Sequence, residues 1–385
     1  MPASDQAWWR ARRAVLLDAL GSRGCAYLYD LATVADQARR LLSLRSLARV
    51  FYAVKANPHP AILTTLAEAG LGFECVSPGE IGRVTAAAAG VGREQLLFTP
   101  NFAPREEYRA ALEQGLRVTV DNVWILRAWG PMFAGREILL RLDTGLAHGH
   151  HEKVRTAGAR SKFGVPPGEV RELAALAAAC GARVVGLHAH GGSGSFDAAH
   201  WKDAALALAA VAPDFPSARV LNLGGGLGVP ERPAQAALDL TALDSALLDF
   251  LALHPGFELW LEPGRFLVAE AGVLLARVTQ VKGKGNRRYV GVAAGMNSLL
   301  RPALYGARHE IVNLTRLDEP PVGRCTVVGP ICESGDVLGE DCPLPACEEG
   351  DVLLIATAGA YGHTMASNYN LRAPAEELVL EPADR

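Results

Sequence analysis

Short apolar runs alternate with segments of helical periodicity over the first two thirds of the chain. Runs of four to six residues rich in Val, Leu and Phe are typical of buried strands. The segments between them often open with proline and close with glycine, the usual start and stop signals of helices. Strand–helix alternation predicts a parallel sheet with helices outside it. The predicted strands are 50–55, 71–76, 96–99, 117–120, 137–142, 183–188, 219–223 and 257–262.

Eight such strands predict closure into a (β/α)8 barrel of the TIM type. An open doubly wound sheet is the alternative, but the G-x-G-x-x-G fingerprint after its first strand is missing. Beyond the barrel, strands follow one another with few helices, which predicts a second, mostly antiparallel β-domain. An extra run at 25–30 can pair with that domain. We expect a barrel over residues 34–268 and a β-domain, a sandwich or Greek-key barrel, made of residues 1–33 and 269–385.

Composition narrows the class of protein. The chain has 385 residues, is 50% hydrophobic and carries a formal charge of −3, which is the profile of an enzyme-sized globular protein. That charge gives no basic surface for nucleic acid or anionic lipid, and no apolar run reaches the length of a membrane span. The cysteines include no C-x-x-C pair, so neither a disulfide framework nor a zinc site is indicated. We expect a cytoplasmic protein with no nucleic-acid or membrane partner.

Polar side chains stand at the carboxyl ends of most predicted strands, where barrels of this type place their active sites. They include Lys55, Glu74, His188, His190, Ser193, Glu262 and Arg265. The seventh strand runs into three glycines, 224–226, whose backbone N–H groups can converge on an anion. A tight turn is the alternative, but the position after the seventh strand, beside Arg265, favours a phosphate, to which Ser193 can add a hydroxyl donor.

Lys55 ends an apolar strand, where a charged amine requires an explanation. A lysine in a partly desolvated pocket deprotonates readily and can form a Schiff base with an aldehyde. The alternative is a structural salt bridge to Glu74. An aldehyde-binding lysine and a phosphate site in one barrel mouth predict pyridoxal 5′-phosphate as cofactor, with Glu262 at the pyridine nitrogen and His190 on the ring face.

Six motifs in chain order strengthen that prediction: FYAVKANP, GLHAHGGSG, NLGGGLG, EPGRFLVAEAG, GPICESGD and GAYGHTMASNYN. They resemble the motifs of the fold-type III pyridoxal-phosphate decarboxylases, which have an alanine racemase-like barrel. The stretch AGMNSLLRPALYGARHEI at 294–311 resembles the diaminopimelate decarboxylases within that family. The resemblance implies decarboxylation of meso-2,6-diaminopimelate at its D-centre to L-lysine and carbon dioxide, the last step of lysine biosynthesis. It also implies a homodimer with shared active sites.

The resemblance assigns roles to individual residues. The catalytic positions are Lys55, His190, Glu262 and Cys332. The cofactor-binding positions are Lys55, Glu74, His190, Ser193, Gly224, Gly225, Gly226, Glu262, Arg265 and Tyr361. The substrate-binding positions are Arg265, Arg301, Tyr305, Glu333 and Tyr361. Cys332 and Glu333 belong to the loop that the other subunit contributes, and Cys332 and Lys55 are both candidate proton donors.

Two arginines favour a dicarboxylate substrate. One carboxylate of meso-diaminopimelate is retained, and a guanidinium binds a carboxylate through two parallel hydrogen bonds. A decarboxylase of ornithine or lysine would have no distal carboxylate, so a buried Arg301 would be a costly unpaired charge there. The alternative is that Arg301 pairs within the β-domain.

Other functions stay open at this point. The chain could decarboxylate another amino acid such as D-ornithine or D-lysine, could be a racemase, or could be a non-catalytic regulator that binds the cofactor. His148, His150, His151 and Glu152 suggest a metal site, but loop spacing gives no preformed chelate and pyridoxal chemistry needs no metal. We therefore expect no metal and interpret 148–152 as a solvated or substrate-covering loop.

Overall fold

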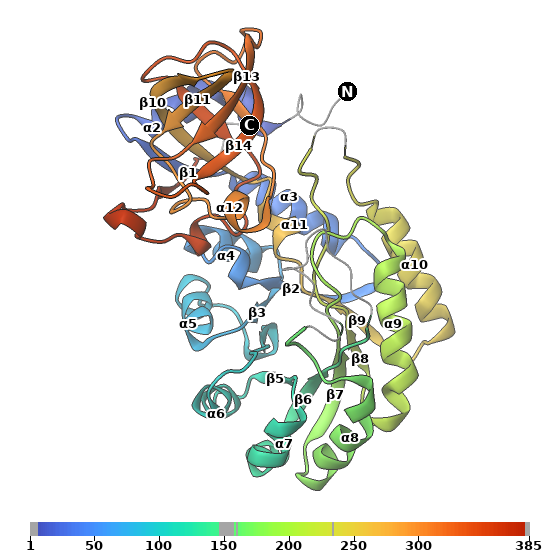
Figure 1. The fold of residues 1–385 in the computed structure, drawn as a ribbon. Helices are drawn as coiled ribbons and strands as arrows, with labels where there is room; N and C mark the ends of the chain where they lie inside the picture. The colour runs from blue at the N-terminus through green and yellow to red at the C-terminus, as the bar shows by residue number, and fades with distance from the viewer. Residues whose placement is uncertain (1–6, 146–157, 159–160, 233–234, 382–385) are drawn as a thin grey trace. The chain divides into compact units, whose positions relative to one another are not determined.

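The computed structural model describes residues 7–145, 158, 161–232 and 235–381. The chain divides into two compact units. One holds residues 35–229 and 237–267, and the other holds residues 1–34, 230–236 and 268–385 (Figure 1). The short segment 230–236 therefore interrupts the first unit in sequence and belongs to the second in space.

The first unit is a closed barrel of eight parallel strands that neighbour one another in chain order, which confirms the predicted (β/α)8 fold. The strands are β2 (Leu47–Ala53), β3 (Gly72–Cys75), β4 (Leu96–Phe98), β5 (Arg117–Val120), β6 (Glu137–Arg141), β7 (Arg183–His188), β8 (Val220–Asn222) and β9 (Glu258–Leu261). Their helices lie outside the strands (Figure 1). These helices are α3 (Leu31–Leu42), α4 (Pro60–Glu68), α5 (Pro78–Ala87), α6 (Arg105–Glu113), α7 (Val123–Trp129), α8 (Val170–Ala179), α9 (Ala199–Val211), α10 (Leu240–Leu253) and α11 (Arg265–Val268).

Large side chains from the barrel strands pack together in an apolar cluster. Phe51 packs against Trp260 with ring centroids 5.1 Å apart, and Leu97, Leu139 and Val220 complete the cluster. Gly72 lies opposite Phe51 in the β2–β3 register, and a Cβ atom there would approach the Phe51 ring to 2.6 Å. The glycine is therefore what allows the phenylalanine to occupy the interior.

Several barrel helices begin where the sequence signals predict. Ser77 precedes α5, and its hydroxyl accepts a hydrogen bond from the backbone N–H of Glu80, with Pro78 in the first turn. Asp239 caps α10 in the same way through the N–H groups of Thr241 and Ala242. These caps satisfy backbone donors that a helix start otherwise leaves without partners.

The second unit is built on a mostly antiparallel sheet. Its strands are β1 (Cys25–Tyr29), β10 (Gly272–Lys284), β11 (Arg287–Val292), β12 (Ile311–Asn313), β13 (Gly323–Val328), β14 (Val337–Leu344), β15 (Val352–Ile355) and β16 (Glu376–Val379). The main strand order is β12-β15-β10-β11-β13-β14, and β1 pairs antiparallel with β10 and parallel with β16. The expectation that the N-terminal strand joins this sheet is confirmed. Helices α1 (Trp8–Ala11), α2 (Arg13–Leu20) and α12 (Arg301–Tyr305) complete the unit.

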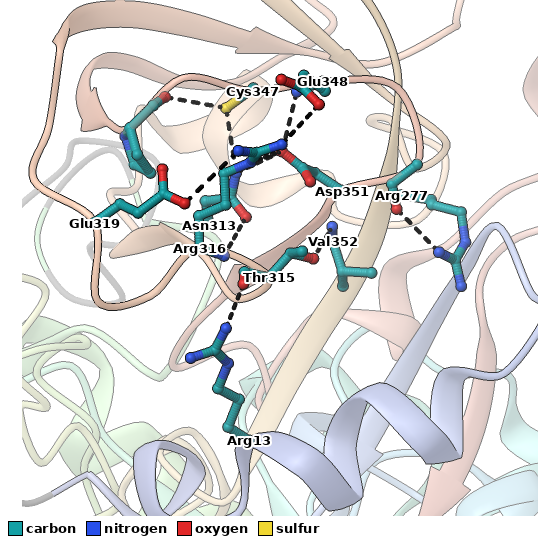
Figure 2. Close-up of polar contacts among 12 residues, drawn as sticks. Arg13, Arg277, Asn313, Thr315, Arg316, Glu319, Cys347, Glu348, Asp351 and Val352 are labelled. Carbon is teal, nitrogen blue, oxygen red and sulfur yellow. Dashed lines mark hydrogen bonds and ion pairs between the residues drawn. The ribbon is translucent and has the colours of Figure 1, made fainter.

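A polar cluster centred on Arg316 joins the ends of β12 and β15 (Figure 2). The Arg316 Nε donates to Asp351 Oδ2 over 2.9 Å, and its Nη2 lies 2.8 Å from Glu348. Asn313 donates to the same Asp351 oxygen over 3.0 Å, and Glu319 lies 3.6 Å from the guanidinium. The cluster ties the segment that follows β12 to the segment that precedes β15. Among the helices that the structure describes, none is long and apolar enough to cross a membrane.

We predict that Leu139→Ala lowers the free energy of unfolding by about 3 kcal/mol, because Leu139 is fully buried in the barrel cluster and its loss leaves a cavity. Leu253→Ala is the matched control, since Leu253 is 76% exposed and its loss should change stability by less than about 0.5 kcal/mol. Urea unfolding followed by circular dichroism measures both. Equal losses in the two variants would contradict the assignment of the core.

Candidate active site

Lys55 lies just beyond the first barrel strand and not in it. The strand β2 ends at Ala53, and Lys55 belongs to a single 3-10 turn, Val54–Ala56. The prediction of a strand over 50–55 is therefore wrong at its end, because the chain turns before the lysine. The Lys55 Nζ donates to Glu74 Oε2 over 2.7 Å.

Glu74 is the buried partner of that ion pair. Its side chain is 1% exposed, whereas that of Lys55 is 44% exposed. Burial raises the pKa of Glu74, and the nearby ammonium of Lys55 opposes this rise. A carboxylate with a raised pKa accepts a proton more readily, and a lysine that has given up its proton is a nucleophile. The salt bridge to Glu74, the alternative to a reactive lysine in the sequence analysis, is thus present. Its presence is compatible with a lysine that reacts with an aldehyde.

Glu262 has the opposite electrostatic setting. It follows β9, and its two oxygens contact His188 Nε2 at 3.0 Å and Asn222 Nδ2 at 2.7 Å. Burial alone would raise the pKa of Glu262, but His188, Lys55 and the Asn222 hydrogen bond together lower it to about 2. Glu262 is therefore an ionised hydrogen-bond acceptor at neutral pH. His188 ends β7 and Asn222 ends β8, so three adjacent strands build this group.

The glycine loop packs against its surroundings too closely for any side chain. A Cβ atom on Gly225 would lie 2.3 Å from the Glu262 carbonyl oxygen, and one on Gly226 would lie 2.2 Å from that of Gly192. Gly224 and Gly226 also have φ values of 66° and 90°, which favour glycine. The three glycines are thus required by conformation and by close approach.

The hydrogen bonds of this loop refine the expected anion site. The Gly224 N–H donates to Asn222 Oδ1 over 3.0 Å, and the Gly225 N–H donates to His190 Nδ1 over 3.2 Å. Of these three N–H groups, only that of Gly226 has no acceptor among the described residues. One backbone donor of the three is therefore available to an anion, and other donors would have to come from neighbouring side chains.

His190 is held as a neutral ring. Its Nδ1 accepts the Gly225 hydrogen bond, so the ring hydrogen lies on Nε2. Burial and the cations Arg141 and Lys55 hold the pKa of His190 well below its usual value. Ser193 lies three residues further on and is half-buried, and Arg265 opens α11 after the eighth barrel strand.

The remaining predicted site residues belong to the second unit, called the β-rich unit below. Arg301 opens α12, is 2% exposed and forms an ion pair with Glu231, while Tyr305 ends the same helix. Cys332 and Glu333 are exposed on the loop before β14, and the backbone N–H of Cys332 donates to Asn370 over 2.7 Å. Tyr361 is half-buried and has a φ of 55°. Arg301 does pair within its own unit, as the structural alternative supposed.

The histidine-rich segment with His148, His150, His151 and Glu152 lies outside the described residues. In the part of the chain that the structure describes, no group of three or more His, Cys, Asp or Glu side chains could hold a metal ion.

Comparison with known proteins identifies the family to which the chain belongs. Residues 31–269 match the family model described as pyridoxal-dependent decarboxylase, pyridoxal binding domain. The chain belongs to this family. It is 39% identical to the diaminopimelate decarboxylase of Methanothermobacter thermautotrophicus, over 92% of this chain and 86% of that protein. It is also 39% identical to the diaminopimelate decarboxylase of Deinococcus radiodurans, over 91% and 89% of the two chains.

A solved structure agrees with these relatives. The diaminopimelate decarboxylase of Helicobacter pylori complexed with L-lysine, in a single-residue variant, has a TM-score of 0.88 at 31% identity, covering 95% of this chain and 94% of that one. The chain is therefore an enzyme of the pyridoxal-dependent decarboxylase family, and pyridoxal phosphate is its cofactor.

Sequence reasoning missed part of this candidate site. His188 was noted without a role, and Asn222 was not noted, although both hold Glu262. Arg141 ends β6, is buried, and lies over the Phe163 ring with its Cζ 4.5 Å from the centroid. Asp121 follows β5 and accepts a hydrogen bond from Asn101. The rule that barrel strands end at the active site would also have found Asn222 and Asp121 had it been applied to every strand.

Glu80 generates a prediction about pH. Its carboxylate accepts a hydrogen bond from the Val76 N–H over 2.7 Å, and burial raises the pKa of Glu80 to about 7 from an unperturbed 4.5. The folded protein thus keeps a proton that the unfolded chain releases near pH 4.5, so the stabilisation from this proton is full below pH 4.5 and is lost as the pH rises through 7. Glu80→Gln should gain stability relative to wild type over that range, by up to about 3 kcal/mol. Urea unfolding between pH 4.5 and 8 measures this gain, and a constant difference would contradict it.

Proposed function

We propose that this chain is a pyridoxal-phosphate-dependent decarboxylase that converts meso-2,6-diaminopimelate at its D-centre to L-lysine and carbon dioxide, the last step of lysine biosynthesis. The observation that carries this proposal is 39% identity to diaminopimelate decarboxylases over nine tenths of the chain. We further propose a cytoplasmic homodimer with shared active sites. The exposed side chains of Cys332 and Glu333 support a loop that acts in the partner subunit's site.

The barrel residues fit pyridoxal 5′-phosphate. Lys55 would hold the aldehyde, and Glu262 would accept a hydrogen bond from the protonated pyridine nitrogen, as its ionised state allows. The Gly226 N–H lies in a loop that no Cβ atom can fill, and it would bind the phosphate with the help of Ser193, Arg265 and Tyr361. When bound, the cofactor supplies a protonated aromatic ring that withdraws electrons from the carbon that loses carbon dioxide.

The chain's own groups prepare that chemistry by holding protons at defined atoms. Glu74 can take the proton of Lys55 across their 2.7 Å contact, which frees the amine to attack an aldehyde. His188 and Asn222 hold the two oxygens of Glu262 and keep it ionised. The neutral His190 ring is oriented by the Gly225 N–H, and a neutral ring can lie on an aromatic face without repelling a ring cation.

In this proposal, residues of the β-rich unit take part in binding the substrate. We propose that Arg301, together with Arg265, Tyr305, Glu333 and Tyr361, binds the distal amino-acid end of the substrate. Cys332 and Lys55 are the candidate donors of the proton that replaces carbon dioxide. Glu231 neutralises Arg301, so an unpaired buried charge no longer argues against a substrate without a distal carboxylate. Support for the dicarboxylate therefore comes from the similarity to diaminopimelate decarboxylases.

We predict that Lys55→Ala folds normally and releases no carbon dioxide from meso-diaminopimelate, because the amine that binds the cofactor aldehyde is lost. The substrate panel should include lysine and ornithine stereoisomers, with carbon dioxide and chiral products measured. Lys202→Ala is the matched control, because Lys202 pairs with Asp249 at 3.5 Å on the barrel's outer helices. Turnover by Lys55→Ala would refute the proposed role, and preference of the wild type for lysine or ornithine would refute the proposed substrate.

We predict that Arg301→Lys raises KM for meso-diaminopimelate roughly tenfold or more, because an ammonium keeps the charge but not the paired donors of guanidinium. Arg287→Lys, an exposed change in β11, is the control and should leave KM unchanged. Steady-state kinetics measures both. An unchanged KM and substrate preference in Arg301→Lys would show that Arg301 does not bind the substrate.

A further inference from the structure

Arg301 is a buried cation with one carboxylate partner in the described structure. Its Nη2 donates to Glu231 Oε1 over 2.8 Å, and its Nη1 donates to His309 Nε2 over 3.1 Å. The Arg301 side chain is 3% exposed and that of Glu231 is 23% exposed. Glu231 thus has access to water, whereas the guanidinium that it neutralises has almost none.

Glu231 engages only one of two neighbouring donors on the Arg301 guanidinium. The Nε–H and one Nη2–H of a guanidinium point in the same direction and together hold both oxygens of a carboxylate. In this structure Arg301 donates to Glu231 through Nη2, and Arg301 Nε is buried with no hydrogen-bond partner among the described residues. The other Glu231 oxygen accepts a long hydrogen bond of 3.4 Å from the Arg308 N–H. One strong donor of Arg301 is therefore left for another acceptor.

The third group of this cluster is a neutral acceptor. Because His309 Nε2 accepts from Arg301, its ring hydrogen lies on Nδ1, which contacts the Ala356 carbonyl oxygen at 2.9 Å. His309 therefore holds the guanidinium in place without neutralising it. Glu231 alone of the two partners carries a charge that opposes Arg301.

From this geometry we propose that Glu231 is an internal carboxylate that occupies Arg301 when the site is empty and is displaced by the distal carboxylate of the substrate. The inference rests on the proposed function, because it takes Arg301 as the group that binds that carboxylate. An incoming carboxylate can bind both Nε and Nη2, so it gains a charge-assisted hydrogen bond that Glu231 does not make. Glu231, already partly exposed, then returns to water.

The exchange has a consequence for both ends of the reaction. L-Lysine keeps the carboxylate of the L-centre, so substrate and product compete with Glu231 for the same guanidinium. Glu231 therefore weakens the binding of substrate and the binding of product by the same factor. It lowers the affinity for the substrate and promotes release of the product. A ligand without a distal carboxylate cannot displace Glu231 and loses nothing to it.

The test replaces the charge of Glu231 and measures binding as well as turnover. In the holoenzyme, Glu231→Gln should lower three quantities together, each by roughly tenfold. These are KM for meso-diaminopimelate, the inhibition constant of L-lysine, and Kd for heptanedioate, an unreactive dicarboxylate, measured by calorimetry. The binding of 1,5-diaminopentane, which has no carboxylate, should not tighten. Glu319→Gln, which removes an exposed carboxylate that pairs with Arg316, is the control and should change none of them.

Thermal unfolding separates this role from a purely structural one. Glu231→Gln should melt at a lower temperature than wild type without ligand, and heptanedioate should raise its melting temperature more than it raises that of wild type. An unchanged or higher KM, with no added rescue by heptanedioate, would overturn the proposal. If Glu231→Gln does not fold, Glu231→Asp, which keeps the charge on a shorter side chain, must show the same direction of change or the proposal fails.

The outcome also separates this inference from the proposed function. If wild type releases no carbon dioxide from meso-diaminopimelate, the proposed function fails, and the calorimetry alone judges Glu231. Tighter binding of heptanedioate to Glu231→Gln would then still support a displaceable carboxylate. Equal binding to wild type and variant would overturn it, whatever the substrate.

Discussion

The barrel depends on compensating the charges that it buries at the carboxyl ends of its strands. Glu74, Glu262 and Arg141 are all nearly inaccessible to water, and an ion buried without a partner is very costly. The strand register supplies the partners. Ala53 is paired with Glu74, which brings Lys55 next to that carboxylate, and His188 is paired with Asn222 beside Glu262. A slip of one residue between neighbouring strands would separate these partners, so charge pairing and barrel register stabilise each other.

The same register gives two carboxylates opposite acid–base properties. Glu74 has one cation against a large desolvation, so its pKa rises, whereas Glu262 has a histidine and an amide on separate oxygens, so its pKa falls to about 2. Two acids with pKa values moved apart can divide the work of accepting a proton and of holding a fixed negative charge. Both properties come from three or four neighbouring residues, without any unusual backbone geometry at either acid.

The sequence allowed the barrel to be predicted, because apolar runs and helix signals are local. Lys55 and Glu262 became candidate site residues because each stands where an apolar run stops. The turn at Lys55 was missed, since periodicity marks a strand but not the residue at which it bends. The partners of Glu262 were missed for another reason. His188 is 74 residues away in the chain and Asn222 is 40, so only the closed barrel brings them together.

The role proposed for Glu231 could not be recognised from the sequence, because it depends on how many carboxylates surround an arginine in the folded chain. Arg301 and Arg316 show this difference. Both arginines lie in the β-rich unit with acidic partners, but Arg316 lies within 3.6 Å of three carboxylates, from Glu319, Glu348 and Asp351 (Figure 2). Such a cation is neutralised from several sides, and removing one anion leaves others in place. Arg301 has one carboxylate, one neutral histidine and one donor without an acceptor. A buried guanidinium that must bind a transient anion needs a replacement when that anion leaves. A single, partly exposed carboxylate that contacts the guanidinium through one of its two oxygens satisfies this need while remaining displaceable.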